Sequence, residues 1–208
     1  MARSRRDRTE NARPELLALL RTHSYRRGMV VLASGRESDF FIDCKPTVLL
    51  AEGHALVAEL MLDALRNLPK CEAVAGVVLG GCSLASAVSM LSHARGRPLH
   101  ALYVRKEAKD HGTRRLIEGP FRQGMKVVML EDVITTGGST LQAVQTLRQE
   151  GAEVVGVVVL VDRLEGGAET LAKAGLETIS IYTRHDFIEE APLSRTLSDS
   201  TLSDSSDS

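Results

Sequence analysis

Residues 127–140 read VVMLEDVITTGGST, and this stretch decides the fold of the chain. Four apolar residues at its start (127–130) are followed by two adjacent acids, Glu131 and Asp132, and then by small residues at 135–140. An amphipathic pattern with apolar residues at helical spacing begins directly afterwards. This order predicts a buried strand with acids at its end, a tight loop and the N-terminus of a helix.

The predicted loop has the chemistry of a phosphate site. Gly137 and Gly138 permit positive φ angles, which turn backbone N–H groups inward, and the helix adds unpaired N–H groups and its positive dipole end. Such a loop suits a phosphate dianion. Glu131 and Asp132 would repel a phosphate, so they suit sugar hydroxyls or a magnesium ion with its waters.

A ribose 5-phosphate carries both kinds of group and matches both halves of the stretch. The alternative is structural, because strand, acid, glycine turn and helix also occur in α/β proteins that bind no nucleotide. Two adjacent acids and six small residues in a row favour the ligand site. The Walker A pattern GxxxxGK[ST] is absent from the stretch.

The stretch closely resembles the 5-phosphoribosyl 1-pyrophosphate (PRPP) motif of the type I phosphoribosyltransferases. The resemblance implies that Glu131 and Asp132 hold the ribose 2′- and 3′-hydroxyls, and that Asp132 is catalytic. It also implies Mg²⁺ as cofactor, bound mainly through PRPP near these two acids and without a direct protein ligand. The residues implied to cradle the 5′-phosphate are Thr135, Thr136, Gly137, Gly138, Ser139 and Thr140.

Composition and charge narrow the class of protein. A chain of 208 residues with 43% hydrophobic and 25% charged residues can bury one ordinary α/β core. Its formal net charge of −1 argues against a nucleic-acid binder, which carries a clear basic excess. Three cysteines without a CxxC pair favour a reducing cytoplasm over a zinc site or a disulfide framework. No apolar run reaches transmembrane length and no signal core follows the basic N-terminus, so we expect neither membrane insertion nor export.

The first part of the chain is expected to form a flexible segment, a helix and a small hood. Residues 1–11 are polar and predicted to be flexible, and Pro14 fits the first turn of a helix that ends near His23. Alternation within about 24–50 predicts a hairpin hood with its turn near 34–36. An amphipathic helix is predicted to follow over 51–68, with Leu56, Leu60 and Ala64 on one face.

The hood contains Phe40 and Phe41, two of the four phenylalanines in the chain. Such a pair forms either the core of the hairpin or a stacking surface for a planar base, and one of the two is expected in the core. The segment resembles the hood of the orotate phosphoribosyltransferases, which covers the pyrimidine, so the resemblance assigns both residues to the orotate site. It departs at Ala33, where some family members carry a lysine that contacts PRPP; Lys45 lies nearby in sequence and is assigned no role.

A second strand–glycine–helix element begins at residue 73. Residues 73–79 form an unbroken apolar run, typical of a parallel strand covered on both faces, and lead into Gly80, Gly81 and a helix. In the resembling family this loop approaches the pyrophosphate of PRPP through backbone groups. Close packing of the helix on the strand, which also needs glycine, is the alternative.

Residues 105–122 form a basic segment between two predicted strands. They hold six Lys and Arg against three acids and little apolar content, which predicts a mobile cover over an anionic site at about 105–120. The sequence RKEAKDHG at its start resembles the catalytic loop of the orotate phosphoribosyltransferases. The resemblance implies that the loop enters the neighbouring subunit's site, so that a homodimer shares its active sites. Residues implied to meet the pyrophosphate are Arg105, Lys106, Lys109 and His111, with Lys109 the main catalytic residue.

The last predicted strands complete the sheet. Residues 153–161 form a buried strand that ends at Arg163, where the resemblance implies contact with orotate, shared with Thr135. Alternating strands and helices predict a mostly parallel, twisted sheet with helices on both faces, which the resemblance makes a type I phosphoribosyltransferase fold. We expect a single domain over 12–195 and a disordered Ser/Asp-rich tail over 196–208.

The expected activity is transfer of the 5-phosphoribosyl group from PRPP to orotate, in pyrimidine (UMP) biosynthesis. Two alternatives remain open from the sequence. One is a phosphoribosyltransferase for another base, such as a purine, because the sugar motif is shared across the superfamily. The other is a non-catalytic regulator that senses PRPP or nucleotides, against which Lys109 and His111 argue.

Overall fold

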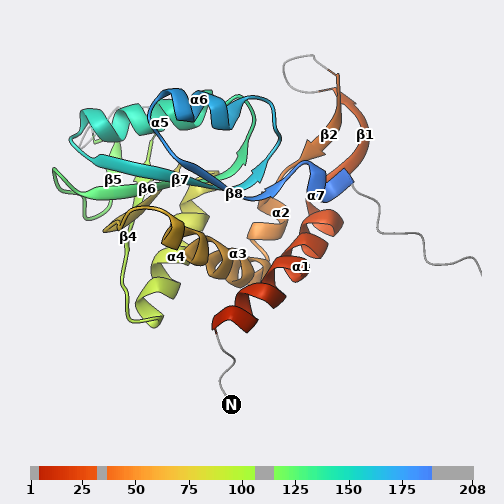
Figure 1. The fold of residues 1–208 in the computed structure, drawn as a ribbon, viewed down its shortest axis with the longest axis horizontal. Coiled ribbons are helices and arrows are strands. Elements are labelled where there is room, and N and C mark those ends of the chain that lie inside the picture. The colour runs from red at the N-terminus through yellow and green to blue at the C-terminus, as the bar shows by residue number, and fades with distance from the viewer. Residues whose placement is uncertain (1–4, 32–36, 106–114, 189–208) are drawn as a thin grey trace, which may run out of the picture.

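The computed structural model describes residues 5–31, 37–105 and 115–188 (Figure 1), and of residues 5–8, 29–31 and 37–38 it describes the backbone alone. The helices are α1 (Arg5–His23), α2 (Lys45–Val48), α3 (Ala51–Ala64), the 3-10 turn η1 (Leu65–Asn67), α4 (Gly80–Ala94), α5 (Gly138–Gln149), α6 (Gly167–Lys173) and α7 (His185–Ile188). The strands are β1 (Tyr25–Val31), β2 (Glu37–Ile42), β3 (Ala73–Val77), β4 (His100–Val104), β5 (Ile117–Glu118), β6 (Lys126–Ile134), β7 (Glu153–Asp162) and β8 (Thr178–Thr183).

The central sheet has six strands in the order β5-β4-β3-β6-β7-β8. All neighbours pair in parallel except β4 and β5, which are antiparallel. The chain winds outward from β3 to β4 and then returns to the other side of β3 with β6, so the winding direction reverses between β3 and β6. Doubly wound sheets bind their ligands at such a switch point, beyond the carboxyl ends of the strands.

Helices cover both faces of this sheet. In Figure 1, α5 and α6 lie on one side of it and α1, α3 and α4 on the other. Val128 and Leu130 of β6 join the apolar core formed with α1, α3 and α4, whereas Val127 and Met129 join the core formed with α5 and α6. Side chains alternate between the two cores, which is why the strand reads as an unbroken apolar run. The predicted fold class is confirmed.

The first helix begins earlier than predicted. It starts at Arg5, so much of the segment 1–11 that was predicted to be flexible is helical, and Pro14 lies inside the helix. Proline removes one N–H donor and disfavours helix at the residue before it. Ala12 and Leu16, which flank it at four-residue spacing, are 3% and 0% exposed, so packing on both sides of the proline outweighs this cost.

The hood is a two-stranded antiparallel hairpin of β1 and β2, as predicted. Its predicted turn at 34–36 lies outside the described residues. The short α2 and then α3 follow; α3 ends at Ala64, and η1 covers part of the remainder of the helix predicted to reach 68. On α3, Leu60 is buried, whereas Leu56 and Ala64 are half-buried.

The segment predicted as a mobile cover over 105–120 is shorter at its C-terminal end. Ile117 and Glu118 form β5 on the edge of the sheet, and Ile117 is 5% exposed. The prediction missed this strand because two residues are too few to show an alternation of apolar and polar side chains. The central part of the cover, the domain boundary at 195 and the tail 196–208 lie outside the described residues. No helix in the described ranges is long and apolar enough to cross a membrane.

Candidate functional site

The two strand–glycine–helix elements meet at the switch point between β3 and β6. Asp132 of β6 faces the start of α4, where a Cβ added to Gly80 would lie 3.0 Å from its Oδ2. A Cβ added to Gly81 would lie 2.7 Å from the Cα of Gly76, so both of these glycines allow α4 to start in contact with β3. The two predicted glycines therefore have different roles. Gly81 allows close packing of α4 on β3, whereas Gly80 borders the candidate site beside Asp132. Sequence reasoning missed Gly76, although a glycine inside a strand signals close backbone approach.

Glu131 and Asp132 leave β6 on opposite faces of the sheet. The strand continues through both acids to Ile134, and side chains alternate along it. Glu131 faces α5, where its Oε2 accepts a 2.7 Å hydrogen bond from the hydroxyl of Thr140. Asp132 faces the start of α4, and its Oδ1 accepts a 2.9 Å bond from the amide of Val133. The space beyond the end of β6 is therefore flanked by one acid on each side.

Glu131 is only 7% exposed, and its environment changes its acidity. Its pKa is raised to about 7, chiefly by burial; the Thr140 hydroxyl opposes the rise and the neighbouring Asp132 carboxylate adds to it. At neutral pH the side chain therefore keeps its proton more readily than an exposed glutamate does.

The loop after β6 presents the start of α5 to the same space. Gly137 has φ +79°, and a Cβ there would lie 2.9 Å from the carbonyl oxygen of Gly167, so the turn requires glycine. The first helical bond runs from the amide of Leu141 to the carbonyl of Gly137, 2.9 Å, so the three amides before it (138–140) have no helical partner. These amides and the positive end of the helix dipole lie where the sequence predicts an anion site.

The side chains of the loop differ in access. Thr136, Gly138 and Ser139 are exposed and Thr135 is half-buried. Thr140, predicted to cradle the phosphate, is 1% exposed and its hydroxyl is bonded to Glu131, so only its backbone amide faces the loop's anion site as a donor. The sequence could not separate it from its neighbours, because burial depends on how α5 packs against β6.

The predicted base end of the site is built on Arg163, which follows β7 and is 7% exposed. Its Nη2 donates a 3.1 Å bond to the carbonyl of Phe40 and lies 2.7 Å from Oε1 of Glu165. Its amide donates to the carbonyl of Ile134 at 3.1 Å. The guanidinium is thus fixed between the hood and the end of the sheet. Glu165 was missed, although an acid two residues from a buried arginine is a readable signal.

Of the two predicted orotate contacts in the hood, Phe40 is a core residue. Its side chain is 0% exposed, and its ring packs on Tyr25 and Phe187 at centroid distances of 5.2 and 5.7 Å. A ring enclosed in this way has no face for a base, so a stacking role for Phe40 is wrong in this arrangement. Phe41, its neighbour on the opposite face of β2, is half-buried.

The start of α2 brings two further residues to Asp132. The thiol of Cys44 lies 3.9 Å from the carbonyl oxygen of Asp132, and Lys45 pairs with Asp43 at 2.6 Å. The pKa of Lys45 is raised, first by the hydrogen bond with Asp43 and further by the charges of Asp43 and Asp132. Lys45 therefore adds positive charge beside the predicted sugar site. It belongs to the same hood as Ala33, which stands where some family members carry a lysine.

The basic segment is described only at its ends. Arg105, after β4, pairs through Nε with Oε1 of Glu118 at 3.0 Å. Lys106, Lys109 and His111 lie outside the described residues, so their roles stay predictions. Among the residues that the structure describes, no group of three His, Cys, Asp or Glu side chains could hold a metal. The two acids at the end of β6, Glu131 and Asp132, are oxygen donors of the kind that Mg²⁺ contacts directly or through its waters.

The fold and the geometry at its switch point define a class: doubly wound α/β proteins, in which this place suits a phosphorylated ligand. Residues 50–188 match the phosphoribosyl transferase domain family. The orotate phosphoribosyltransferase of Sorangium cellulosum (strain So ce56) is 67% identical over 182 residues, which cover 86% of this chain and 95% of that protein. The chain therefore belongs to the phosphoribosyltransferases and, within them, to the orotate phosphoribosyltransferase family.

Solved structures agree. Orotate phosphoribosyltransferase of Mycobacterium tuberculosis H37Rv in complex with Fe(III) dicitrate superimposes with a TM-score of 0.75 at 40% identity, covering 86% of this chain and 99% of that one. The same enzyme in complex with PRPP gives a TM-score of 0.72 at 37% identity, covering 85% and 98%. The predicted family is confirmed.

Proposed function

We propose that this protein transfers the 5-phosphoribosyl group of PRPP to orotate, giving orotidine 5′-monophosphate and pyrophosphate in the de novo synthesis of UMP. One observation carries the proposal: a phosphate-type loop and two diverging acids meet at the β3/β6 switch point. The similarity to orotate phosphoribosyltransferases over nearly their full length supports the choice of base.

At the sugar end, the free amides at the start of α5 hold the 5′-phosphate, assisted by the hydroxyls of Thr135, Thr136 and Ser139. Glu131 and Asp132 accept hydrogen bonds from the ribose hydroxyls, and they do so from opposite sides because they leave β6 on opposite faces. Thr140 contributes its amide and, through its bond to Glu131, keeps that carboxyl oriented.

At the base end, Arg163 receives the carboxylate and a carbonyl of orotate. A planar guanidinium is suited to such a paired contact, and the bonds of Arg163 to Glu165 and to the carbonyl of Phe40 fix its plane in advance. Phe41 and Thr135, both half-buried, complete the contact with the base.

The reaction is a displacement at C1 of the ribose by N1 of orotate, with inversion of that centre. Positive charge develops on the ribosyl ring, and the carboxylate of Asp132 stabilises it. Negative charge develops on the leaving pyrophosphate, which Arg105, Lys106, Lys109 and His111 approach when their loop closes and excludes water. Mg²⁺, when bound with PRPP, supplies further positive charge to the pyrophosphate.

The active unit in this proposal is a homodimer with shared sites. On α4, the exposed Met90 (67%) stands eleven residues, or three helical turns, after the exposed Leu79 (76%). Ser83 and Ser86 lie between them on the same stripe, and neither is buried. A stripe with two large exposed apolar ends beside the switch point suits a partner subunit whose loop enters this site.

Mixing two inactive variants tests the shared site. Lys109→Ala should lower turnover by about two orders of magnitude, roughly 3 kcal/mol of transition-state stabilisation, and Asp132→Asn should also inactivate the enzyme. If Lys109 acts in the partner's site, a mixed dimer contains one site with both native residues, and mixing restores part of the activity. Mixed dimers that stay as inactive as the parents would refute sharing.

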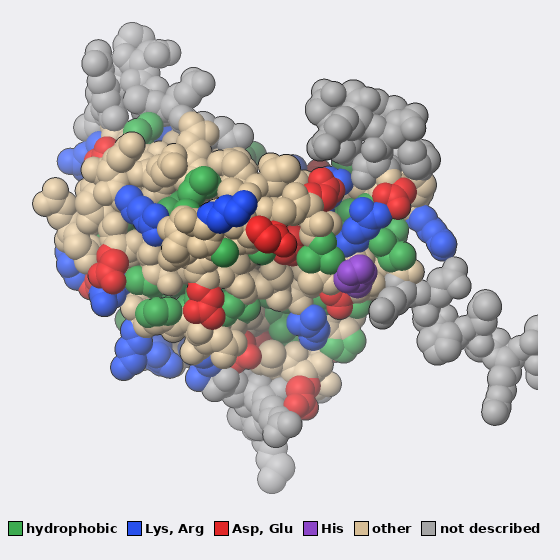
Figure 2. Space-filling model, turned by 45° about the horizontal axis from the view of Figure 1, so that its top comes forward, with side chains coloured by type: hydrophobic (Ala, Val, Ile, Leu, Met, Phe, Trp, Pro, Cys, Tyr) green, Lys and Arg blue, Asp and Glu red, His purple; other side chains and the backbone are tan. Residues whose placement is uncertain are grey.

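The remaining parts of the proposal are an absence of nucleic-acid and membrane partners and a cytoplasmic location. Figure 2 shows Lys and Arg side chains interspersed with Asp and Glu on the face in view, which supports the absence of nucleic acid. Cys44, Cys71 and Cys82 are all free thiols, which suits a reducing compartment.

Orotate consumption tests the function directly. Purified protein is mixed with orotate, PRPP and Mg²⁺, and orotate is followed by ultraviolet absorbance beside a control without PRPP. PRPP-dependent loss of orotate, with pyrophosphate formed in equal amount, supports the proposal. A protein that binds PRPP but consumes adenine, guanine or hypoxanthine instead of orotate is a purine enzyme, and one that binds PRPP but consumes no base is a regulator.

A further inference from the structure

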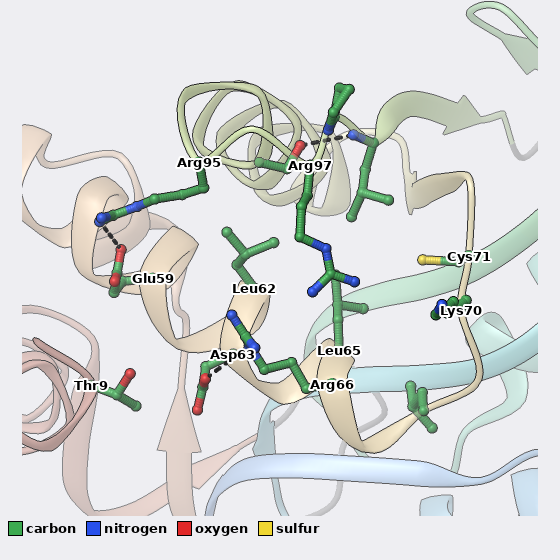
Figure 3. A pocket seen from close by; sticks show the side chains of 14 residues that line it. Thr9, Glu59, Leu62, Asp63, Leu65, Arg66, Lys70, Cys71, Arg95 and Arg97 are labelled. Atoms are coloured by element: carbon green, nitrogen blue, oxygen red, sulfur yellow. Dashed lines mark hydrogen bonds and ion pairs between the residues drawn. The ribbon is translucent and has the colours of Figure 1, made fainter. Parts of the chain in front are cut away.

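A cavity of about 720 Å³ (Figure 3) lies at the amino ends of the parallel strands β3 and β4. It is lined by Thr9 of α1, by α3 and η1, by the C-terminal end of α4 and by the segments that lead into β3 and β4. Those segments stand at the amino ends of the parallel strands, whereas the motif stands beyond their carboxyl ends. The cavity is therefore separate from the candidate active site.

The floor of this cavity is apolar. Leu62, Leu65 and Leu99 line it, and the first and last are only half-buried, so they expose apolar surface to a ligand. Figure 3 shows Leu62 and Leu65 facing the middle of the cavity from α3 and η1. Covering this surface would favour a complex, because it removes apolar area from water.

The rim is cationic. Arg66, Lys70, Arg95 and Arg97 line the cavity against two carboxylates, Glu59 and Asp63. Each carboxylate is already matched with one arginine: Arg95 lies 2.8 Å from Glu59, and Arg66 lies 3.4 Å from Asp63. The lining thus has two positive charges more than it has negative charges.

Arg97 and Lys70 supply this excess. In the part of the chain that the structure describes, neither forms an ion pair with a carboxylate. Figure 3 shows the Arg97 side chain reaching from the end of α4 across the cavity toward Leu65. Its charge also acts on Cys71, the pKa of which burial raises to about 11 while Arg97 opposes the rise. A positive charge over an apolar floor suits an anionic group attached to an apolar body.

We propose that this cavity binds an organic anion in which an apolar, planar body carries one phosphate, sulfonate or carboxylate group. The anionic group pairs with Arg97 and Lys70, and the body covers Leu62, Leu65 and Leu99. The volume falls in the range of ligand sites, about 300–1,000 Å³. The proposal does not depend on the proposed catalytic function.

The test uses 8-anilino-1-naphthalenesulfonate, which joins a planar apolar body to one sulfonate, and N-phenyl-1-naphthylamine, which has the same body without the charge. Both are titrated into the full-length protein and followed by fluorescence. We expect the sulfonate to bind at one site and at least about tenfold more tightly than the neutral probe. Equal affinities would overturn the role of Arg97 and Lys70.

Variants of the protein show whether the probe binds in this cavity. Arg97→Glu should weaken binding of the sulfonate by at least about tenfold, and Arg97→Lys should retain most of it. Lys173→Glu, on the exposed surface of α6 across the sheet, is the matched control and should bind like wild type. Thermal unfolding checks that every variant is folded. Binding that survives Arg97→Glu in a folded protein, or that pyrophosphate with Mg²⁺ displaces, would refute the proposed site.

Discussion

Thr140→Val tests how the sugar site responds to pH. In the wild type, the Thr140 hydroxyl donates a 2.7 Å bond to Glu131, and this bond opposes the burial that raises the pKa of Glu131 to about 7. Valine has nearly the same shape but no donor. A hydrogen bond to a charged group is worth about 1.5–3 kcal/mol, and one pKa unit corresponds to about 1.4 kcal/mol. We therefore expect the pKa of Glu131 to rise by at least about one unit in the variant.

The assay is the pH dependence of kcat/KM for PRPP, which reports the ionisation of the free enzyme. Ribose hydroxyls donate to the carboxylate form of Glu131, so the wild-type value should rise with pH through about 7 and then level off. In Thr140→Val the same rise should occur at higher pH, and the value at neutral pH should fall at least about fivefold.

The control is Thr140→Ser, which keeps the donor and should keep the wild-type profile. A Thr140→Val profile that superimposes on that of the wild type would show that the ionisation of Glu131 does not govern binding of PRPP. A uniform loss at every pH, without a shift of the rise, would also refute the reasoning. Such a loss would mean that Thr140 acts through shape rather than through the acidity of Glu131.

Three further predictions follow from the site and the fold. Arg163→Lys removes the planar fork, so KM for orotate should rise at least about tenfold while KM for PRPP changes little. Steady-state kinetics with each substrate varied measures both constants, and an unchanged KM for orotate would contradict the prediction. Gly81→Ala puts a Cβ 2.7 Å from the Cα of Gly76, so urea unfolding should show a loss of about 1–3 kcal/mol, whereas Gly138→Ala, with nothing within 4 Å, should be close to neutral. Glu131 holds its proton more tightly in the folded protein (pKa about 7) than its ordinary value of 4.5, so folding stability should fall as pH rises between these values; Glu131→Gln should remove that fall, and an unchanged pH dependence would contradict the assignment.

The core of the fold was predictable from the sequence because its signals are local. The run at 127–130, the glycines at 137–138 and the helical spacing after them each predict one element, and the structure contains all three. The divergence of Glu131 and Asp132 was not predicted, because the strand was taken to end at these two acids and their alternation was not considered. β6 stays paired with β7 past both acids, and Glu131 pairs with Val159, which lies 28 residues further along the chain.

The base end was less predictable because it depends on contacts between distant segments. The alternation of side chains along β2 predicts that Phe40 and Phe41 face opposite ways, but it does not predict which of them faces inward. That choice is made by Tyr25 of β1 and by Phe187 of α7, whose rings enclose Phe40. No pattern near residue 40 contains this information.

The attachment of the hood also determines when, during synthesis, the binding site can be completed. Arg184 donates to both carboxylate oxygens of Asp39 at 2.7 Å, and Phe187 packs on Phe40. The hood is made early, but these anchors leave the ribosome only with the last described residues of the chain. A nascent chain can thus form the phosphate loop while the base end is still incomplete, and loss of 184–188 by early termination would leave a protein that holds sugar phosphates without a fixed hood.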